Sequence, residues 1–127
     1  MKIFNTKFHG LKIIKGINHY DKRGYFRETF KNNFFKNKNF IFWCLSKSKK
    51  NVLRGLHLQK KFQQDKFVSV VRGKIFDVVV DLRKKSKTYG KCCTNTLSDK
   101  NSTSLFIPSG FAHGFCALEN ENLVLYG

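Results

Sequence analysis

Two segments centred on histidine carry the residue types best suited to chemistry. The first, VLRGLHLQ at positions 52–59, places Arg54 three residues before His57, with Gly55 between them. The second, FIPSGFAHGF at positions 106–115, places His113 after a Pro-Ser-Gly turn. A neutral imidazole accepts a proton near neutral pH, a guanidinium binds an anion through two donors, and a glycine allows close backbone approach. The sequence therefore predicts that His57 removes a proton in a pocket beside an arginine.

The two segments together resemble the cupin signature, a G…HxH…E…G element followed by a PxGxxH element. In metal-binding cupins these positions supply three histidines and one glutamate. Here they read His57, Gln59, Gln64 and His113. Two imidazoles and two neutral amides are a poor ligand set for a divalent cation. We therefore expect a pocket with no metal and no cofactor, suited to proton abstraction.

The elements that position these residues are predicted to be short strands joined by turns. Apolar and β-branched stretches predict strands at 66–71, 74–82, 104–107 and 123–126, separated by turn signals at 72–73, 89–90, 98–99 and 108–110. Phe30, Phe34 and Phe35 have a spacing that indicates a short helix over 29–35. This pattern predicts an all-β, cupin-type jelly roll (a double-stranded β-helix) with one short helix near the N-terminus. At 127 residues, the chain is expected to form a single domain over 1–127.

The formal charge of +17 comes from 25 Lys and Arg against 8 Asp and Glu. These cations are scattered along the chain, whereas nucleic-acid readers more often concentrate them on one element, so we expect no nucleic-acid partner. The charge favours an anionic small molecule instead. No stretch is long and apolar enough for a membrane helix and no secretory leader is visible, so we expect a cytoplasmic protein without membrane contact. The four cysteines have no metal-site spacing and are expected to be buried or half-buried free thiols.

Six motifs in a fixed order resemble the dTDP-4-dehydrorhamnose 3,5-epimerase family. They cover nearly the whole chain, which makes the resemblance far more specific than any single motif. They are DKRGYFRE at 21–28, VLRGLHLQ at 52–59, QDK at 64–66, GKIFDVVVDLR at 73–83, SKTYG at 86–90 and IPSGFAHGF at 107–115.

The resemblance implies a reaction on dTDP-4-dehydro-6-deoxy-glucose, whose C4 ketone acidifies the protons at C3 and C5. By similarity His57 is the base, Lys66 stabilises the enolate oxygen, and Tyr126 returns a proton to the opposite face. The resemblance also implies a homodimer in which N-terminal strands complete the partner's sheet. The implied substrate-binding residues are Arg23, Phe26, Glu28, Arg54, Gln64 and His113.

Simpler interpretations exist for several of these residues. Most single histidines in proteins are hydrogen-bonded core residues, and it is the adjacent Arg54 and Gly55 that favour chemistry at His57. Arg23 and Glu28 also fit a surface ion pair. Phe26 fits a core position, and Tyr126 fits an ordinary strand aromatic.

The sequence also departs from the family pattern in ways that suggest other functions. Phe42 and Cys44 stand where the family carries Gln and Asn, which favours a single-site epimerase acting on another 4-keto sugar nucleotide. Lys87 replaces a turn proline. The chain ends after Tyr126-Gly127, so we expect it to be truncated relative to the family. Such a chain would lack the aspartate that orients the base and would leave its last strand unpaired, consistent with a non-catalytic remnant that binds nucleotide sugars.

Overall fold

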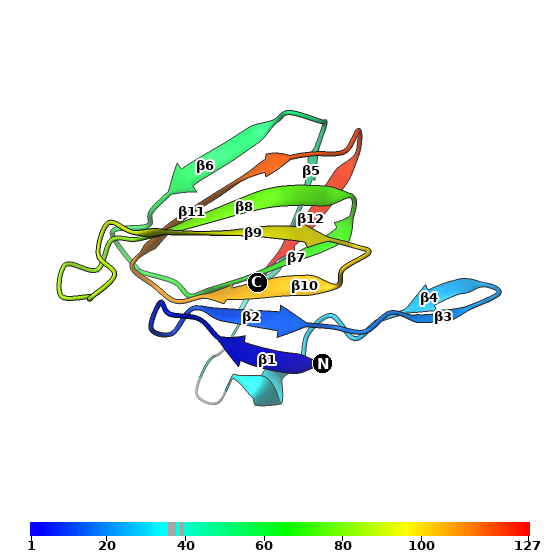
Figure 1. Cartoon of the computed structure of the whole chain (residues 1–127), viewed down its shortest axis with the longest axis horizontal. Coiled ribbons are helices and arrows are strands. Elements are labelled where there is room, and N and C mark those ends of the chain that lie inside the picture. Colours follow the sequence, from blue (N-terminus) through cyan, green and yellow to red (C-terminus); the bar gives the residue numbers. More distant parts are fainter. Residues whose placement is uncertain (36–37, 39) are drawn as a thin grey trace.

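The computed structural model describes residues 1–35, 38 and 40–127 of the chain. Two antiparallel sheets face each other, and a small hairpin projects from one end (Figure 1). The larger sheet has the strand order β1-β2-β10-β7-β12-β5, and the smaller has the order β6-β11-β8-β9. Neighbours far apart in sequence, such as β2 with β10 and β5 with β12, give the crossing connections of a jelly roll. The predicted all-β jelly-roll fold is confirmed.

The strands are short and make up about half of the described chain. Their bounds are β1 (Lys2–Asn5), β2 (Lys12–Lys15), β3 (His19–Asp21), β4 (Gly24–Phe26), β5 (Cys44–Ser48), β6 (Leu53–His57), β7 (Lys66–Arg72), β8 (Lys74–Asp81), β9 (Cys92–Ser98), β10 (Thr103–Ile107), β11 (Phe111–Ala117) and β12 (Asn122–Tyr126). Among the described residues, one 3-10 helix, η1 (Asn32–Phe34), lies between β4 and β5.

The four predicted strands are confirmed as β7, β8, β10 and β12, and the four turn signals fall in their connections. The predicted helix over 29–35 is wrong, because only the turn η1 forms there and no side chain caps its N-terminus. Its phenylalanines pack from several directions into an aromatic cluster, so their spacing does not reflect one helical face. The shorter and more polar strands were not predicted, because their apolar and polar residues alternate too weakly.

The core lies between the two sheets, and β8 shows how the sequence builds it. Its buried residues alternate as Ile75, Asp77, Val79 and Asp81, the period of two expected for a strand with one face inward. Two of these four inward side chains are carboxylates, which a core accepts only when they are paired. The apolar core consists of Phe8, Leu11, Val68, Val70, Ile75, Val79, Leu97, Leu105, Ile107, Phe111, Phe115 and Val124.

An aromatic cluster covers the other face of the larger sheet. Phe67 on β7 is fully buried, and Phe35 stacks on Phe106 with ring centroids 4.9 Å apart. Phe40 and Trp43 pack edge-on against Phe67 at 6.3 and 5.9 Å. Aromatic burial of this kind fixes the segment leading into β5 against the sheet. That segment continues into the wall of the site described below.

The last strand, β12, lies inside the larger sheet. It pairs with β7 on one side and with β5 on the other. The expectation that the final strand would be left unpaired is therefore wrong. The pairing places Tyr126 between two neighbouring strands, opposite Cys44 of β5 and Val68 of β7.

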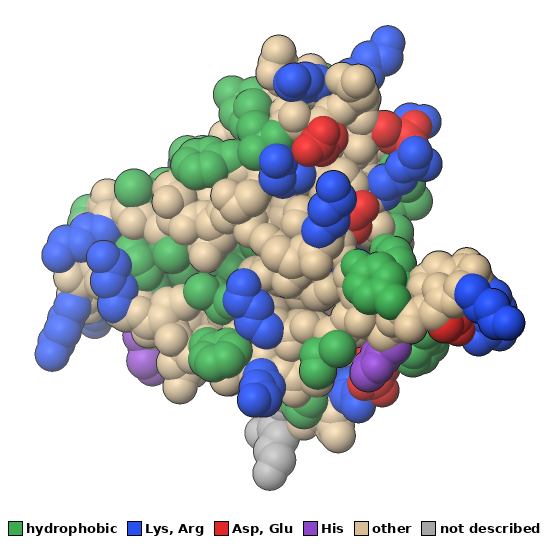
Figure 2. Space-filling model, turned by 45° about the vertical axis from the view of Figure 1, so that its right-hand side comes forward, with side chains coloured by type: hydrophobic (Ala, Val, Ile, Leu, Met, Phe, Trp, Pro, Cys, Tyr) green, Lys and Arg blue, Asp and Glu red, His purple; other side chains and the backbone are tan. Residues whose placement is uncertain are grey.

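The cationic side chains are dispersed over the surface. Figure 2 shows Lys and Arg in several separate groups on the face in view, with acidic side chains between some of them. Several are neutralised locally, as where Glu121 pairs with both Lys47 and Arg72. Within the described residues, no helix has the length and apolar character needed to span a bilayer.

Candidate active site

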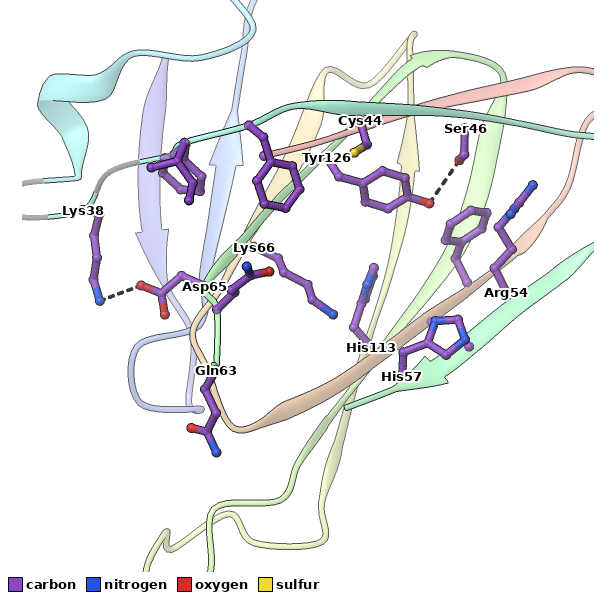
Figure 3. Close-up of a pocket in the computed structure, with 18 of the residues that line it drawn as sticks. Lys38, Cys44, Ser46, Arg54, His57, Gln63, Asp65, Lys66, His113 and Tyr126 are labelled. Carbon is purple, nitrogen blue, oxygen red and sulfur yellow. Dashed lines mark hydrogen bonds and ion pairs between the residues drawn. The ribbon is translucent and has the colours of Figure 1, made fainter. Parts of the chain in front are cut away.

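A pocket of about 840 Å³ opens between the two sheets and collects six of the nine predicted site residues (Figure 3). Its walls come from β5 and β12 of the larger sheet, β6 and β11 of the smaller sheet, the start of β7, and the segments 40–42 and 63–65. The volume falls in the range of ligand-binding pockets. The six predicted residues that line it are Arg54, His57, Gln64, Lys66, His113 and Tyr126.

A bulge in β6 turns Arg54 and His57 into the same pocket. His57 pairs with His113 and Arg54 with Phe115, so β6 advances three residues while β11 advances two. Residues three apart in a regular strand point to opposite faces. The extra residue in β6 brings Arg54 and His57 to the same face. Gly55 has φ +105°, and a Cβ there would lie 2.6 Å from Gly114 Cα. The predicted close backbone approach at this glycine is therefore confirmed.

Arg54 is oriented by the edge strand β5. Its Nε donates to Ser48 Oγ at 2.8 Å and its Nη2 donates to the Lys47 carbonyl at 3.1 Å. These bonds use part of the guanidinium fork, and the remaining N–H groups are available to an anion. Arg54 lines the pocket beside His57. The pair can bind an anionic group next to a base.

His57 itself has an exposed side chain and no hydrogen-bond partner among the described residues. It stands across the β6–β11 ladder from His113, which has a buried partner. His113 Nε2 is 2.7 Å from Asp77 Oδ2, and both side chains are buried. A carboxylate only accepts, so this contact places a proton on Nε2 of the imidazole.

Lys66 enters the pocket at the start of β7. Burial lowers the pKa of its ammonium below the usual 10.5, and no described residue forms an ion pair with it. The strand start is fixed by paired backbone bonds between Phe67 and Gly127 of 2.8 and 2.9 Å. Just before it, Asp65 accepts from Ser109 N at 2.9 Å. An unpaired cation held in this way can stabilise negative charge that develops on a substrate oxygen.

Tyr126 enters from β12, on the opposite sheet to His57. Its hydroxyl lies 3.1 Å from Ser46 Oγ (Figure 3). Its ring lies against Phe115 with centroids 6.4 Å apart. Burial raises the pKa of the Tyr126 phenol above 10.0, although the hydrogen bond with Ser46 and the charge of Arg54 partly offset this rise. The phenol is therefore protonated at neutral pH and can act as an acid.

Three predicted substrate-binding residues do not line this pocket. Arg23, Phe26 and Glu28 lie on or just after the projecting β3–β4 hairpin (Figure 1). Phe26 is 69% exposed, so it is not a core residue. Arg23 pairs with Asp21 at 2.6 Å and Glu28 pairs with a lysine three residues on, so the two do not form the surface ion pair considered from sequence.

The residues that depart from the family pattern form part of the pocket wall. Phe42 and Cys44 both line the pocket and are exposed there. All four cysteines are free, but the expectation that they are buried or half-buried is wrong for Cys44 and Cys92, which are exposed. Lys87 is exposed in the loop after β8.

Three of the four cupin metal positions, His57, Gln64 and His113, line the pocket. Gln59 is exposed beyond the end of β6 and does not line the pocket, whereas Gln64 does. In the described part of the chain, no three His, Cys, Asp or Glu side chains gather as metal ligands.

Two residues at the site were missed from the sequence. Asp77 was detectable, because it occupies an inward position between Ile75 and Val79 in an otherwise apolar strand. Ser46 had no such signal, because its contact with Tyr126 joins residues 80 apart in the chain.

Comparison with known proteins gives a consistent result. The family model described as dTDP-4-dehydrorhamnose 3,5-epimerase matches residues 5–127. A dTDP-4-dehydrorhamnose 3,5-epimerase of Methanothermobacter thermautotrophicus is 46% identical over 98% of this chain and 70% of its own length. One of Neisseria gonorrhoeae is 45% identical over 99% of this chain, which spans 40% of that relative. The crystal structure of a Legionella pneumophila dTDP-6-deoxy-D-glucose-3,5-epimerase in complex with dTDP-4-keto-L-rhamnose superposes with a TM-score of 0.93 at 40% identity, covering 98% of this chain and 69% of that one.

Proposed function

The chain belongs to the dTDP-4-dehydrorhamnose 3,5-epimerase family of isomerases, and we propose that it inverts C3 and C5 of dTDP-4-dehydro-6-deoxy-glucose to give dTDP-4-dehydro-rhamnose. Residues 1–127 act as a single cupin domain in this proposal. The observation that carries it is the placement of a base and an acid on opposite walls of one pocket. His57 comes from the smaller sheet and Tyr126 from the larger (Figure 3). Inversion at a carbon requires this arrangement, because the proton must leave one face of the planar enolate and return to the other.

The remaining pocket residues support the steps between deprotonation and reprotonation. His57 removes the proton beside the C4 ketone, and the electron pair of the broken C–H bond moves onto the ketone oxygen. The Lys66 ammonium, unpaired within the described residues, stabilises the resulting enolate oxygen. Tyr126 then gives its proton to the carbon from the other side. Arg54 binds the diphosphate, for which a guanidinium fork is well matched.

The test is proton NMR of dTDP-4-dehydro-6-deoxy-glucose in deuterated water with the purified chain. We expect the C3 and C5 proton signals to be lost, and His57→Ala to abolish that loss. His9→Ala is a matched control, because His9 lies outside the pocket and should not matter. A folded chain that binds the sugar nucleotide but exchanges neither proton would contradict the proposal. That result would favour the alternative of a non-catalytic remnant that binds nucleotide sugars.

A second candidate is a single-site epimerase acting on another 4-keto sugar nucleotide. The observation that favours it is the pocket wall at Phe42 and Cys44, which offers an aromatic ring and a thiol to the substrate. A changed set of hydrogen bonds at the sugar alters which substrate and which carbon are presented to the base. The same NMR measurement distinguishes the two, because exchange at only one carbon would identify the single-site enzyme.

We further propose a homodimer in which the β3–β4 hairpin of one subunit reaches the pocket of the other. The hairpin is exposed on both strands, projects from the body, and carries Arg23 and Phe26, which are remote from the pocket of their own subunit (Figure 1). An exposed aromatic ring beside an arginine suits a nucleotide base and its phosphates.

We also retain the expected cytoplasmic location, which cell fractionation would test.

Mixing two inactive variants tests this arrangement. Arg23→Ala removes the hairpin cation, and His57→Ala removes the base. If Arg23 acts in the partner's pocket, a mixed dimer contains one intact site, and mixing the variants should restore about a quarter of the activity after random subunit exchange. A monomer by light scattering, or a mixture no more active than its components, would contradict the proposal.

A further inference from the structure

The Tyr126 phenol depends on one side chain for its orientation. Among the described residues, its hydroxyl has a single hydrogen-bond partner, Ser46 Oγ at 3.1 Å. Tyr126 stands opposite Cys44 in the β12–β5 ladder, and Ser46 is two residues further along β5, on the same face. Diagonal neighbours of this kind lie within reach of a long aromatic side chain. The ring is therefore held at its face by Phe115 and at its tip by Ser46.

β5 carries two hydroxyls on one face, Ser46 in the pocket wall and the buried Ser48, and each binds a different site residue. Ser46 contacts the Tyr126 hydroxyl, and Ser48 accepts from Arg54 Nε at 2.8 Å. The residue between them, Lys47, points away and pairs with Glu121. Backbone pairing of an edge strand does not require serines. Because side chains alternate along β5, Ser46 and Ser48 point to the same face, toward Tyr126 and Arg54.

The chemistry of proton donation gives Ser46 a second task. A neutral phenol and a serine hydroxyl can each donate to the other, but a phenolate can only accept. When the O–H bond of Tyr126 breaks and its proton forms the new C–H bond, the electron pair stays on the phenolate oxygen. Ser46 must then be the donor. A hydrogen bond to the charged form stabilises that form, which opposes the effect of burial on the same oxygen.

We propose that Ser46 is a positioning residue for the epimerisation, which aims the Tyr126 hydroxyl at the substrate carbon and donates a hydrogen bond to the phenolate left after proton transfer. This role rests on the proposed function. It predicts a defect in one half of the reaction only. Ser46 does not contact His57, so removing its hydroxyl impairs reprotonation on the tyrosine face and leaves proton removal by His57 intact.

The experiment compares solvent exchange with inversion. Because His57 is exposed, a proton that it removes is replaced by solvent deuterium before it returns to the same face. Ser46→Ala should lower the rate of inversion about 10- to 100-fold, the effect of one hydrogen bond to a charged group. The rate of deuterium incorporation without inversion should stay close to that of the wild type. Ser46→Thr keeps a hydroxyl and should restore inversion.

Two further variants separate this role from a structural one. Ser104→Ala removes a buried serine–serine hydrogen bond of 2.9 Å in the same sheet, away from the pocket, and should leave both rates unchanged. In a Tyr126→Phe background, Ser46→Ala should cause no additional loss of inversion, because the two residues act as a unit. Equal losses of exchange and inversion in Ser46→Ala, or additive losses in the double variant, would overturn the proposal. A wild type with no exchange would instead overturn the proposed function and this role with it.

Discussion

At the scale of single residues, the pocket contains two kinds of side chain. Tyr126, Arg54 and His113 each have a protein partner that fixes their direction, namely Ser46, Ser48 and Asp77. His57 and Lys66 have none among the described residues, and both face the pocket. The residues proposed to bind and reprotonate the substrate are therefore pre-oriented, and those proposed to remove the proton and stabilise the enolate oxygen are free to contact it.

Asp77 should control which nitrogen of His113 carries the proton. Its carboxylate accepts from Nε2, and its other oxygen, Oδ1, is buried without a partner in the described part of the protein. Asp77→Asn keeps the shape but introduces an amide that can donate as well as accept, so both tautomers of His113 become accessible. We expect nitrogen NMR of the imidazole to show an Nε2–H tautomer in the wild type and a mixture in the variant. The KM should rise about tenfold through one weakened substrate contact. An unchanged tautomer would contradict the assignment.

At the scale of elements, the β6 bulge determines which side chains share the pocket. It depends on Gly55, whose position leaves no room for a Cβ and whose φ is positive. Gly55→Ala should lower the free energy of unfolding by about 3 kcal/mol or more, because backbone strain adds to a clash with backbone atoms that cannot rotate away. Activity should be lost as Arg54 and His57 are displaced.

Gly90→Ala is the matched control for this variant. Gly90 also has a positive φ, of +73°, but a Cβ there would meet nothing within 4 Å. Only the conformational strain remains, and its expected cost is about 1 kcal/mol. Urea unfolding of both variants measures the difference, and equal destabilisation would contradict the close-approach argument.

The loop after β8 is organised by a buried carboxylate. Burial alone would raise the pKa of Asp81, but hydrogen bonds from Arg83, Ser86 and Thr88 reverse this and hold the pKa far below 3.8. Because the folded-state pKa is depressed, the ionised carboxylate stabilises the fold above the unfolded-state value of about 4, and this contribution is lost as the pH falls below it. Asp81→Asn should lower the free energy of unfolding by about 3 kcal/mol at neutral pH.

The difference in free energy of unfolding between the wild type and Asp81→Asn should become smaller as the pH falls below about 4. Unfolding curves at several pH values would measure it. Asp21 provides the control, because it binds Arg23 two residues on with the same pair of guanidinium donors but at the surface. Asp21→Asn should have a much smaller effect, since exposed pairs are screened by water. A difference that stayed constant with pH would show that Asp81 stabilises the fold by shape alone.

At the scale of the whole molecule, the net charge of +17 acts through its long-range field. We expect the dispersed cations to attract an anionic sugar nucleotide and not to read nucleic acid. Raising the salt concentration from about 0.02 to 0.5 M should lower kcat/KM several-fold, because the Debye length falls below the size of the protein, while kcat changes little. Sucrose at equal osmolality controls for viscosity and crowding. A kcat/KM independent of salt would show that the charge has no role in substrate capture.

The sequence by itself determined the fold class, the more apolar strands and six of the residues that line the pocket. It could do so because these properties are local. Alternation within β8 shows which face is buried. In one short segment, Gly55 beside Arg54 and His57 marks a position where another backbone can approach closely. The motif order added the family, which the comparison with known proteins confirmed.

Only the tertiary structure decided which residues hold the site together and which lie outside it. Ser46 and Tyr126 are 80 residues apart, and Asp77 and His113 are 36 apart, so no local pattern links them. The phenylalanines of 30–35 pack against β7 and β10 and not along a helix, because burial against the sheet outweighs local spacing. The hairpin that carries Arg23 forms a two-stranded sheet of its own, β3 with β4, and does not line the pocket, a placement that no local pattern in the sequence indicates.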